Sequence, residues 1–195
     1  MKEIRTFIAI PISTPVRRHA KKLVQDLQLA GDGVGWVPLE HLHLTLKFLG
    51  EVENNRIAEV CQIARQCCGP TPQTRVHFAG IDAFPHMRRP RVIHASIARG
   101  GPVLAELVSR LEQAYATVGF KPEPRDWRPH LTLGRVRRRG KSIDALRDRM
   151  KPHCDVDLGD MLVDTVQVYA SFLDKRGPTY NVMDTIVLQP TDDAT

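Results

Sequence analysis

The tetrapeptide His-Leu-Thr-Leu occurs twice in this chain, at residues 43–46 and 130–133, which are 87 positions apart (130 − 43). In a β-strand, side chains at positions i and i+2 share a face. His43 is therefore expected beside Thr45, and His130 beside Thr132, while the leucines turn to the opposite face. Two imidazoles, each next to a hydroxyl, are suited to acid–base chemistry on a phosphate ester without a metal ion.

An unperturbed imidazole titrates near pH 6.5, so both of its protonation forms are accessible in a cell. One histidine can accept the proton of an attacking water while the other protonates the leaving oxygen, and each such transfer contributes about 10²–10⁴-fold to the rate. The hydroxyls of Thr45 and Thr132 can donate hydrogen bonds to phosphoryl oxygens, so we expect both threonines to bind substrate.

A metal site is the main alternative use of these histidines, because His41 shares the predicted face of His43. No acidic or cysteine ligand accompanies this pair nearby, and the second copy carries Arg128 at the equivalent position, which cannot bind a metal. The chain has four cysteines without a CxxC pair, so we expect reduced thiols. We therefore expect no metal and no cofactor.

The composition is that of an ordinary globular protein: 195 residues, 42% hydrophobic and 26% charged. The net charge of +6 and the pI of about 9.4 favour a polyanionic partner such as nucleic acid. No stretch approaches the roughly 20 apolar residues of a membrane span. The apolar run at 7–10 is too short for a signal peptide, so we expect a cytoplasmic protein with no membrane partner. We also expect the protein to be a monomer.

The sequence predicts helices and strands in mixed order along the chain. Helical spacing of apolar residues predicts four helices, at 15–30, 53–68, 102–118 and 142–150. Strands are predicted at 4–10, 42–49, 73–84, 91–98, 131–136, 162–172 and 180–188, with Gly50 ending the second of them. Each half of the chain holds one motif strand preceded by a Trp-x-Pro. We expect an α+β fold in one domain over residues 1–195, with two pseudo-symmetric lobes. Each lobe has an antiparallel-rich sheet and helices, and a central cleft lies between them.

These segments together resemble the 2H phosphoesterase superfamily, and most closely its RNA 2′,3′-cyclic phosphodiesterase branch, also called 2′-5′ RNA ligase. The resemblance is carried by residues 5–10, 42–50, 129–135, 169–171 and 177–180. It implies two lobes whose motifs face each other across a cleft. It also implies metal-independent hydrolysis of RNA 2′,3′-cyclic phosphate ends, or of small cyclic nucleotides, to 2′-phosphates. By this resemblance His43 is the proton donor and His130 the proton acceptor; the residues alone leave the two roles interchangeable.

Two alternatives to the hydrolase stay open: reversible 2′-5′ RNA ligation at the same site, and an RNA- or nucleotide-binding module without catalysis. The chain has no GxxxxGK[ST] loop for ATP, and binding alone does not need paired acid–base groups. Arginines are the expected contacts to flanking RNA phosphates, and aromatic rings to a base. The candidates are Arg88, Arg89, Arg91, Arg135, Arg137, Arg138, Arg139 and Lys141 for phosphates, and Phe7, Phe48, Phe84 and Trp36 for a base.

Overall fold

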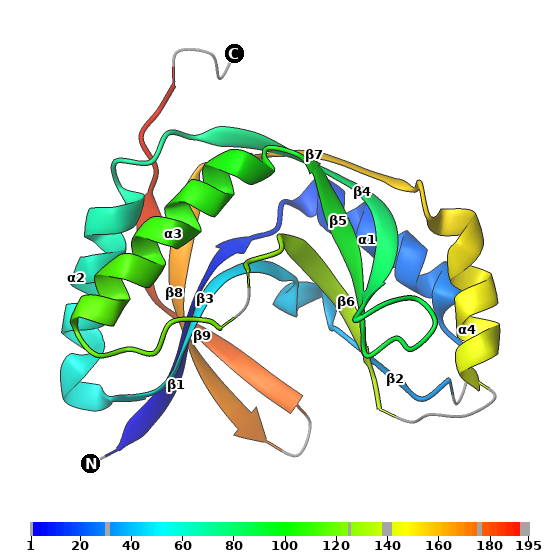
Figure 1. Cartoon of the computed structure of the whole chain (residues 1–195), viewed down its shortest axis with the longest axis horizontal. Helices are drawn as coiled ribbons and strands as arrows, with labels where there is room; N and C mark the ends of the chain where they lie inside the picture. Colours follow the sequence, from blue (N-terminus) through cyan, green and yellow to red (C-terminus); the bar gives the residue numbers. More distant parts are fainter. Residues whose placement is uncertain (1, 30–31, 125, 138–141, 175–176, 192–195) are drawn as a thin grey trace.

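The computed structural model describes residues 2–29, 32–124, 126–137, 142–174 and 177–191. Within these ranges, nine strands form two antiparallel sheets (Figure 1). The first sheet has the order β3-β1-β8-β9, with β1 at Glu3–Pro11, β3 at His43–Glu53, β8 at Thr165–Asp174 and β9 at Gly177–Val187. The second sheet has the order β2-β6-β5-β4-β7, with β2 at Val34–Trp36, β4 at Thr74–Phe84, β5 at Val92–Arg99, β6 at His130–Val136 and β7 at Asp157–Val163. The expected α+β fold with two sheets is confirmed.

Among the described residues, each sheet is covered by two helices, and two of these helices follow a strand of the other sheet. Helices α2 (Ile57–Cys68) and α3 (Gly101–Thr117) pack together on the first sheet, whereas α1 (Thr14–Leu27) packs on β7 of the second sheet, beside α4 (Ser142–Met150). Helix α1 thus follows a strand of the first sheet but covers the second, and α3 does the reverse. Each lobe is assembled from both halves of the chain, which the sequence did not predict.

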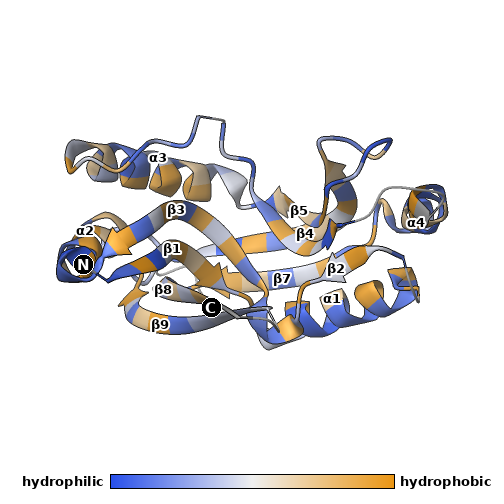
Figure 2. Ribbon diagram, turned by 90° about the horizontal axis from the view of Figure 1, so that it is seen from below, coloured by the Kyte–Doolittle hydropathy of each residue, from blue (hydrophilic) through white to orange (hydrophobic). Residues whose placement is uncertain are grey.

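The core follows from the apolar periodicity of these elements (Figure 2). Helix α1 buries Val16, Ala20, Leu23 and Leu27, spaced as one helical face. In the motif strands Leu44, Leu46, Leu131 and Leu133 are 2% exposed or less, as the period of two predicts. The motif leucines therefore fix both strands against the core and leave the histidine face free.

Several predicted boundaries were wrong, and strand β2 was not predicted. The predicted strand at 162–172 is two strands, because the chain leaves the second sheet at Asp164 and enters the first. Strand β3 continues past Gly50, whose φ of +77° coincides with a shift of register against β1. Helix α2 begins at Ile57, after a 3-10 turn at Asn54–Arg56.

None of the helices in the described part of the chain has the length and apolar character of a membrane-spanning segment.

Candidate active site

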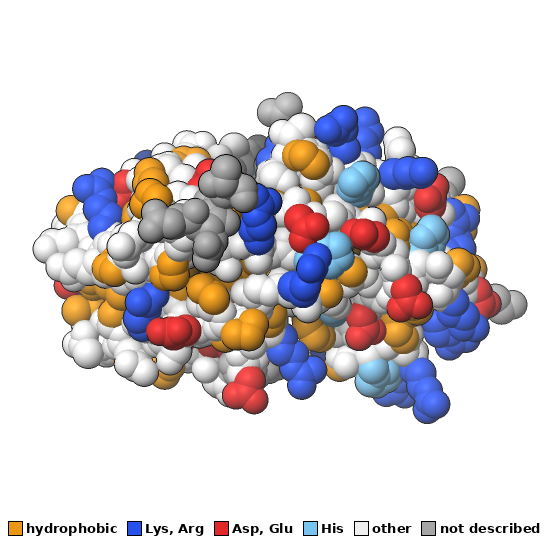
Figure 3. Space-filling view, turned by 90° about the horizontal axis from the view of Figure 1, so that it is seen from above, with side chains coloured by type: hydrophobic (Ala, Val, Ile, Leu, Met, Phe, Trp, Pro, Cys, Tyr) orange, Lys and Arg blue, Asp and Glu red, His pale blue; other side chains and the backbone are white. Residues whose placement is uncertain are grey.

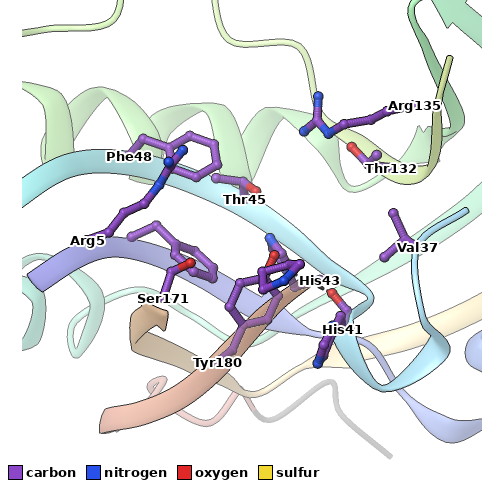
Figure 4. Close-up of a pocket in the computed structure, with 12 residues that line it drawn as sticks. Arg5, Val37, His41, His43, Thr45, Phe48, Thr132, Arg135, Ser171 and Tyr180 are labelled. Carbon is purple, nitrogen blue, oxygen red and sulfur yellow. Dashed lines mark hydrogen bonds between the residues drawn. The ribbon is translucent and has the colours of Figure 1, made fainter. Parts of the chain in front are cut away.

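The two motif strands border a cavity of about 390 Å³ between the sheets (Figure 4). His43 and Thr45 line it from β3, and Thr132 lines it from β6. The other described lining residues are Arg5, Phe7, Val37, His41, Phe48, Arg135, Ser171, Pro178 and Tyr180. His130 lies beside the cavity on β6, two residues before Thr132, but its side chain is not among the lining groups. The structure thus brings three of the four predicted site residues to one cavity and the fourth to its border.

Both motif histidines are oriented by the same kind of hydrogen bond, to the backbone carbonyl two residues earlier. Nδ1 of His43 lies 2.7 Å from the carbonyl oxygen of His41, and Nδ1 of His130 lies 2.8 Å from that of Arg128. A carbonyl can only accept, so in each ring Nδ1 carries the hydrogen and donates it to the residue two positions earlier. In both neutral rings Nε2 is therefore the basic nitrogen, and neither Nε2 has a hydrogen-bond partner among the described residues.

Aromatic rings surround His43 and keep its imidazole neutral. Phe7 lies 4.9 Å from it and Tyr180 5.4 Å, between ring centroids. Burial among these rings lowers the pKa of His43 to about 4, because desolvation penalises the charged form. The hydrogen bond to His41 opposes the change, while the charges of Arg135 and His130 lower the pKa further.

His130 has its own aromatic surroundings on the second sheet. The ring of Phe84 lies 4.9 Å away, edge to face, and that of His94 5.3 Å away. Burial lowers the pKa of His130, and the charge of Arg135 adds to this. Neither histidine is therefore charged at neutral pH in the free protein, and a bound anion is needed to favour an imidazolium in the cavity.

His94 was not predicted from the sequence. It is 4% exposed, stacks on Phe84 with 4.1 Å between centroids, and neither of its nitrogens makes a hydrogen bond among the described residues. Burial lowers its pKa to about 4, and the neighbouring His130 adds to the effect. The carboxylate of Asp82 opposes this lowering, as does the backbone of Ala95, which lies nearby outside hydrogen-bond geometry.

The hydroxyls of Thr45 and Thr132 are free to bind a ligand, since neither donates a hydrogen bond to a described residue. Arg135 lies beside Thr132 at one end of the cavity (Figure 4). In the sequence between them, Gly134 packs against two side chains of β2; a Cβ there would lie 2.9 Å from Cγ1 of Val34 and 3.0 Å from Cε3 of Trp36. A larger residue at position 134 would therefore have to push these side chains aside.

The loop before the second motif is tied to the first motif strand. The indole N–H of Trp127 donates to the carbonyl of Thr45 at 3.1 Å. The next residues of β3 add an ion pair, because the buried Lys47 ammonium lies 2.6 Å from the carboxylate of Glu112 in α3. That carboxylate also accepts the backbone N–H of Glu123, at the start of the loop. These contacts fix the chain entering β6 relative to β3, and hence one motif relative to the other.

Only some of the residues predicted to contact RNA bases and phosphates line the cavity. Phe7 and Phe48 line it, and Phe48 is 51% exposed. Of the basic candidates only Arg135 lines the cavity; the side chain of Arg137 lies over Gly35 of β2. Basic side chains on the face in Figure 3 are scattered among acidic ones. Arg88, Arg89 and Arg91 do not line the cavity, and Arg138, Arg139 and Lys141 lie outside the described residues.

The sequence missed three polar groups of the cavity wall. Arg5 and Ser171 come from β1 and β8, and Tyr180 from β9. His41 also lines the cavity; it lies in a 3-10 turn, Leu39–His41, and not in an extended segment as its predicted position on the His43 face implied. Among the described residues, no group of three or more His, Cys, Asp and Glu side chains is placed to hold a metal ion.

Comparisons with known proteins show the family of this chain. A family model described as the 2′-5′ RNA ligase superfamily matches residues 15–171. The RNA 2′,3′-cyclic phosphodiesterases of Methanocaldococcus jannaschii and Thermotoga maritima are each 31% identical over 183 residues. These matches cover 92% of this chain, and 98% and 93% of the two relatives, respectively.

Solved structures share the fold. The protein TT0787 of Thermus thermophilus has a TM-score of 0.80 at 23% identity, covering 95% of this chain and 98% of that one. Escherichia coli LigT complexed with 3′-AMP has a TM-score of 0.79 at 21% identity, covering 96% and 99%. Because the family model spans most of the chain and includes both motifs, the protein belongs to the 2′-5′ RNA ligase superfamily.

Proposed function

We propose that the protein hydrolyses the 2′,3′-cyclic phosphate at the end of an RNA to a 2′-phosphate, using His43 and His130 without a metal ion. The observation that carries the proposal is the matched pair of Nδ1 hydrogen bonds to backbone carbonyls. They give both rings the same tautomer, with Nε2 as the group that exchanges protons. The names of the relatives supply the substrate class.

The reaction needs one proton removed and one delivered. Nε2 of neutral His130 accepts the proton of a water molecule as its oxygen attacks phosphorus. The bond from phosphorus to the 3′ oxygen breaks, and Nε2–H of protonated His43 donates to that oxygen, so the phosphate remains on the 2′ oxygen. The assignment of donor and acceptor rests on the family resemblance.

The substrate itself supports the required protonation state. A phosphodiester is an anion, and a negative charge close to an imidazole raises its pKa. The Thr45 and Thr132 hydroxyls are proposed to hydrogen-bond the phosphoryl oxygens as charge shifts onto them, and Arg135 to neutralise that charge. The exposed ring of Phe48 offers a face on which the terminal base can stack.

The proposal is tested by incubation of an oligoribonucleotide ending in a 2′,3′-cyclic phosphate with the protein in excess chelator. We expect a mass gain of one water, and phosphorus NMR of the product from a cyclic mononucleotide should show a 2′-phosphate. An oligonucleotide with a 3′-hydroxyl end is the control and should stay unchanged. Binding without turnover would instead favour the non-catalytic module, and joined products with a 5′-hydroxyl RNA would favour ligation.

The proposal also covers the cellular setting. A monomer in the cytoplasm would meet RNA ends of this kind directly. Cell fractionation, and light scattering on the purified protein, test these two points.

A further inference from the structure

The cavity continues from the motif residues to a second polar end on the first sheet. Arg5 and Phe48 lie at that end, while Thr132 and Arg135 lie at the other (Figure 4). Arg5 and Arg135 are the two cations among the described residues that line the cavity, and no carboxylate is among them. Two separated cations in one cavity fit a ligand with more than one phosphate.

Strand register builds this second end. Arg5 of β1 lies directly opposite Ser171 of β8, and Ser171 lies directly opposite Tyr180 of β9. Directly opposed residues share a face, with Cβ atoms about 5 Å apart, so the three side chains form one row across three neighbouring strands. All three line the cavity. The row is thus part of the sheet rather than of a loop.

The polar atoms of this row are available to a ligand. Arg5 forms no ion pair with any described residue, although Glu51 lies opposite it on β3. The hydroxyls of Ser171 and Tyr180 make no hydrogen bond to a described residue, and Ser171 is only 9% exposed.

The Tyr180 hydroxyl feels the charges of both arginines of the cavity. Burial raises the pKa of Tyr180, while the charges of Arg135 and Arg5 both oppose the change. The phenol therefore stays protonated at neutral pH and can donate to an anion. The row thus presents one guanidinium and two hydroxyls to the cavity as possible donors.

We propose that Arg5, Ser171 and Tyr180 form a second phosphate subsite, which binds the phosphate on the 5′ side of the terminal nucleotide. In an RNA this group is the last internucleotide phosphate. The inference rests on the proposed function, in which the cyclic phosphate lies between the motif histidines. It makes the protein select the end of an RNA chain over a free cyclic nucleotide.

The test measures binding of two reaction products, so that it does not depend on turnover. Adenosine 2′-phosphate and adenosine 2′,5′-bisphosphate differ only by the 5′-phosphate that the subsite would bind. Calorimetry should give a lower Kd for the bisphosphate by about 10- to 100-fold, the effect of hydrogen bonds to a charged group. In Arg5→Gln this ratio should fall toward one, and in Ser171→Ala it should fall less.

Arg18→Gln is the matched control, because it removes the same charge from the exposed face of α1, away from the cavity. It should keep the wild-type ratio. Salt gives a second readout: loss of one phosphate contact should lower the slope of log Kd against log salt by about 0.7. Circular dichroism checks that the variants are folded.

Equal binding of the two products by the wild-type protein, or an unchanged ratio in Arg5→Gln, would overturn the inference. Failure of the proposed function gives a different result. In that case cyclic nucleotides are not hydrolysed, whatever the ratio of the two product affinities.

Discussion

The pH dependence of catalysis should be set by burial of His43. The acid in the proposed mechanism must be protonated, yet burial lowers the pKa of His43 to about 4. At about pH 7 only about one free molecule in a thousand then carries the imidazolium. Each unit of acidification raises that fraction about tenfold, while the base stays neutral until its own pKa is reached.

The profile of kcat/KM reports the pKa values of the free enzyme. It should therefore rise by about tenfold per unit of acidification from about pH 7 until the base begins to be protonated, with its alkaline limb below the ordinary histidine value of 6.5. The acidic limb should also lie below 6.5, since burial lowers the pKa of His130 as well. The two limbs belong to the interacting pair rather than to either residue.

Bound substrate should move the profile. The profile of kcat reports the complex, where the phosphate anion lies beside the imidazoles. Restoring His43 from about 4 to 6.5 requires about 3 kcal/mol in favour of the charged form. An anion at about 4 Å supplies about 4 kcal/mol at an effective dielectric constant of 20, which is sufficient. The alkaline limb of kcat should thus lie at higher pH than that of kcat/KM.

The assay is steady-state hydrolysis of adenosine 2′,3′-cyclic phosphate between about pH 5 and about pH 8, at constant ionic strength. An alkaline limb of kcat/KM at or above 6.5 would show that burial does not control the acid. Coincident limbs for kcat and kcat/KM would refute the role given to the substrate charge.

Three further substitutions test the surrounding structure. His94→Phe removes two buried nitrogens without partners, so urea unfolding should show about 1–3 kcal/mol more stability. Because the unfolded state binds the His94 proton at higher pH than the folded state, stability should fall on acidification from pH 6.5 to about 4 in the wild type, and less in this variant. Trp127→Phe removes the hydrogen bond to the Thr45 carbonyl; we expect about 1 kcal/mol less stability and a lower kcat at little changed KM in steady-state assays. Gly134→Ala forces a Cβ against Trp36 and should lower the unfolding free energy by about 1–3 kcal/mol, read from the urea midpoint.

The motif strands could be predicted because their information is local. Alternation of polar and apolar residues places His43 with Thr45 and buries Leu44, which the structure confirms. The helices followed from apolar spacing in the same way. The break at Asp164 could not be found, because apolar residues continue on both sides and only pairing with different sheets separates the two strands.

The other groups of the cavity depend on pairings between distant residues. Arg5 meets Ser171 across 166 positions (171 − 5), and no local pattern encodes that register. His94 reaches the second motif in the same way, since it lies opposite Thr132 on the neighbouring strand. The sequence predicts which residues carry acid–base chemistry, but strand register decides which side chains join them.

The proposed two-histidine mechanism is tested most directly by matched histidine variants. Their turnover of a cyclic-phosphate-ended RNA is measured in excess chelator. His43→Ala and His130→Ala should each lower kcat/KM by at least about 100-fold, the lower end of the contribution of one acid or base. His41→Ala should cost much less, because the His41 group that holds His43 is the backbone carbonyl, which alanine keeps. Near-wild-type turnover in either motif variant, or wild-type activity that is lost in chelator and restored by zinc or manganese, would contradict the account.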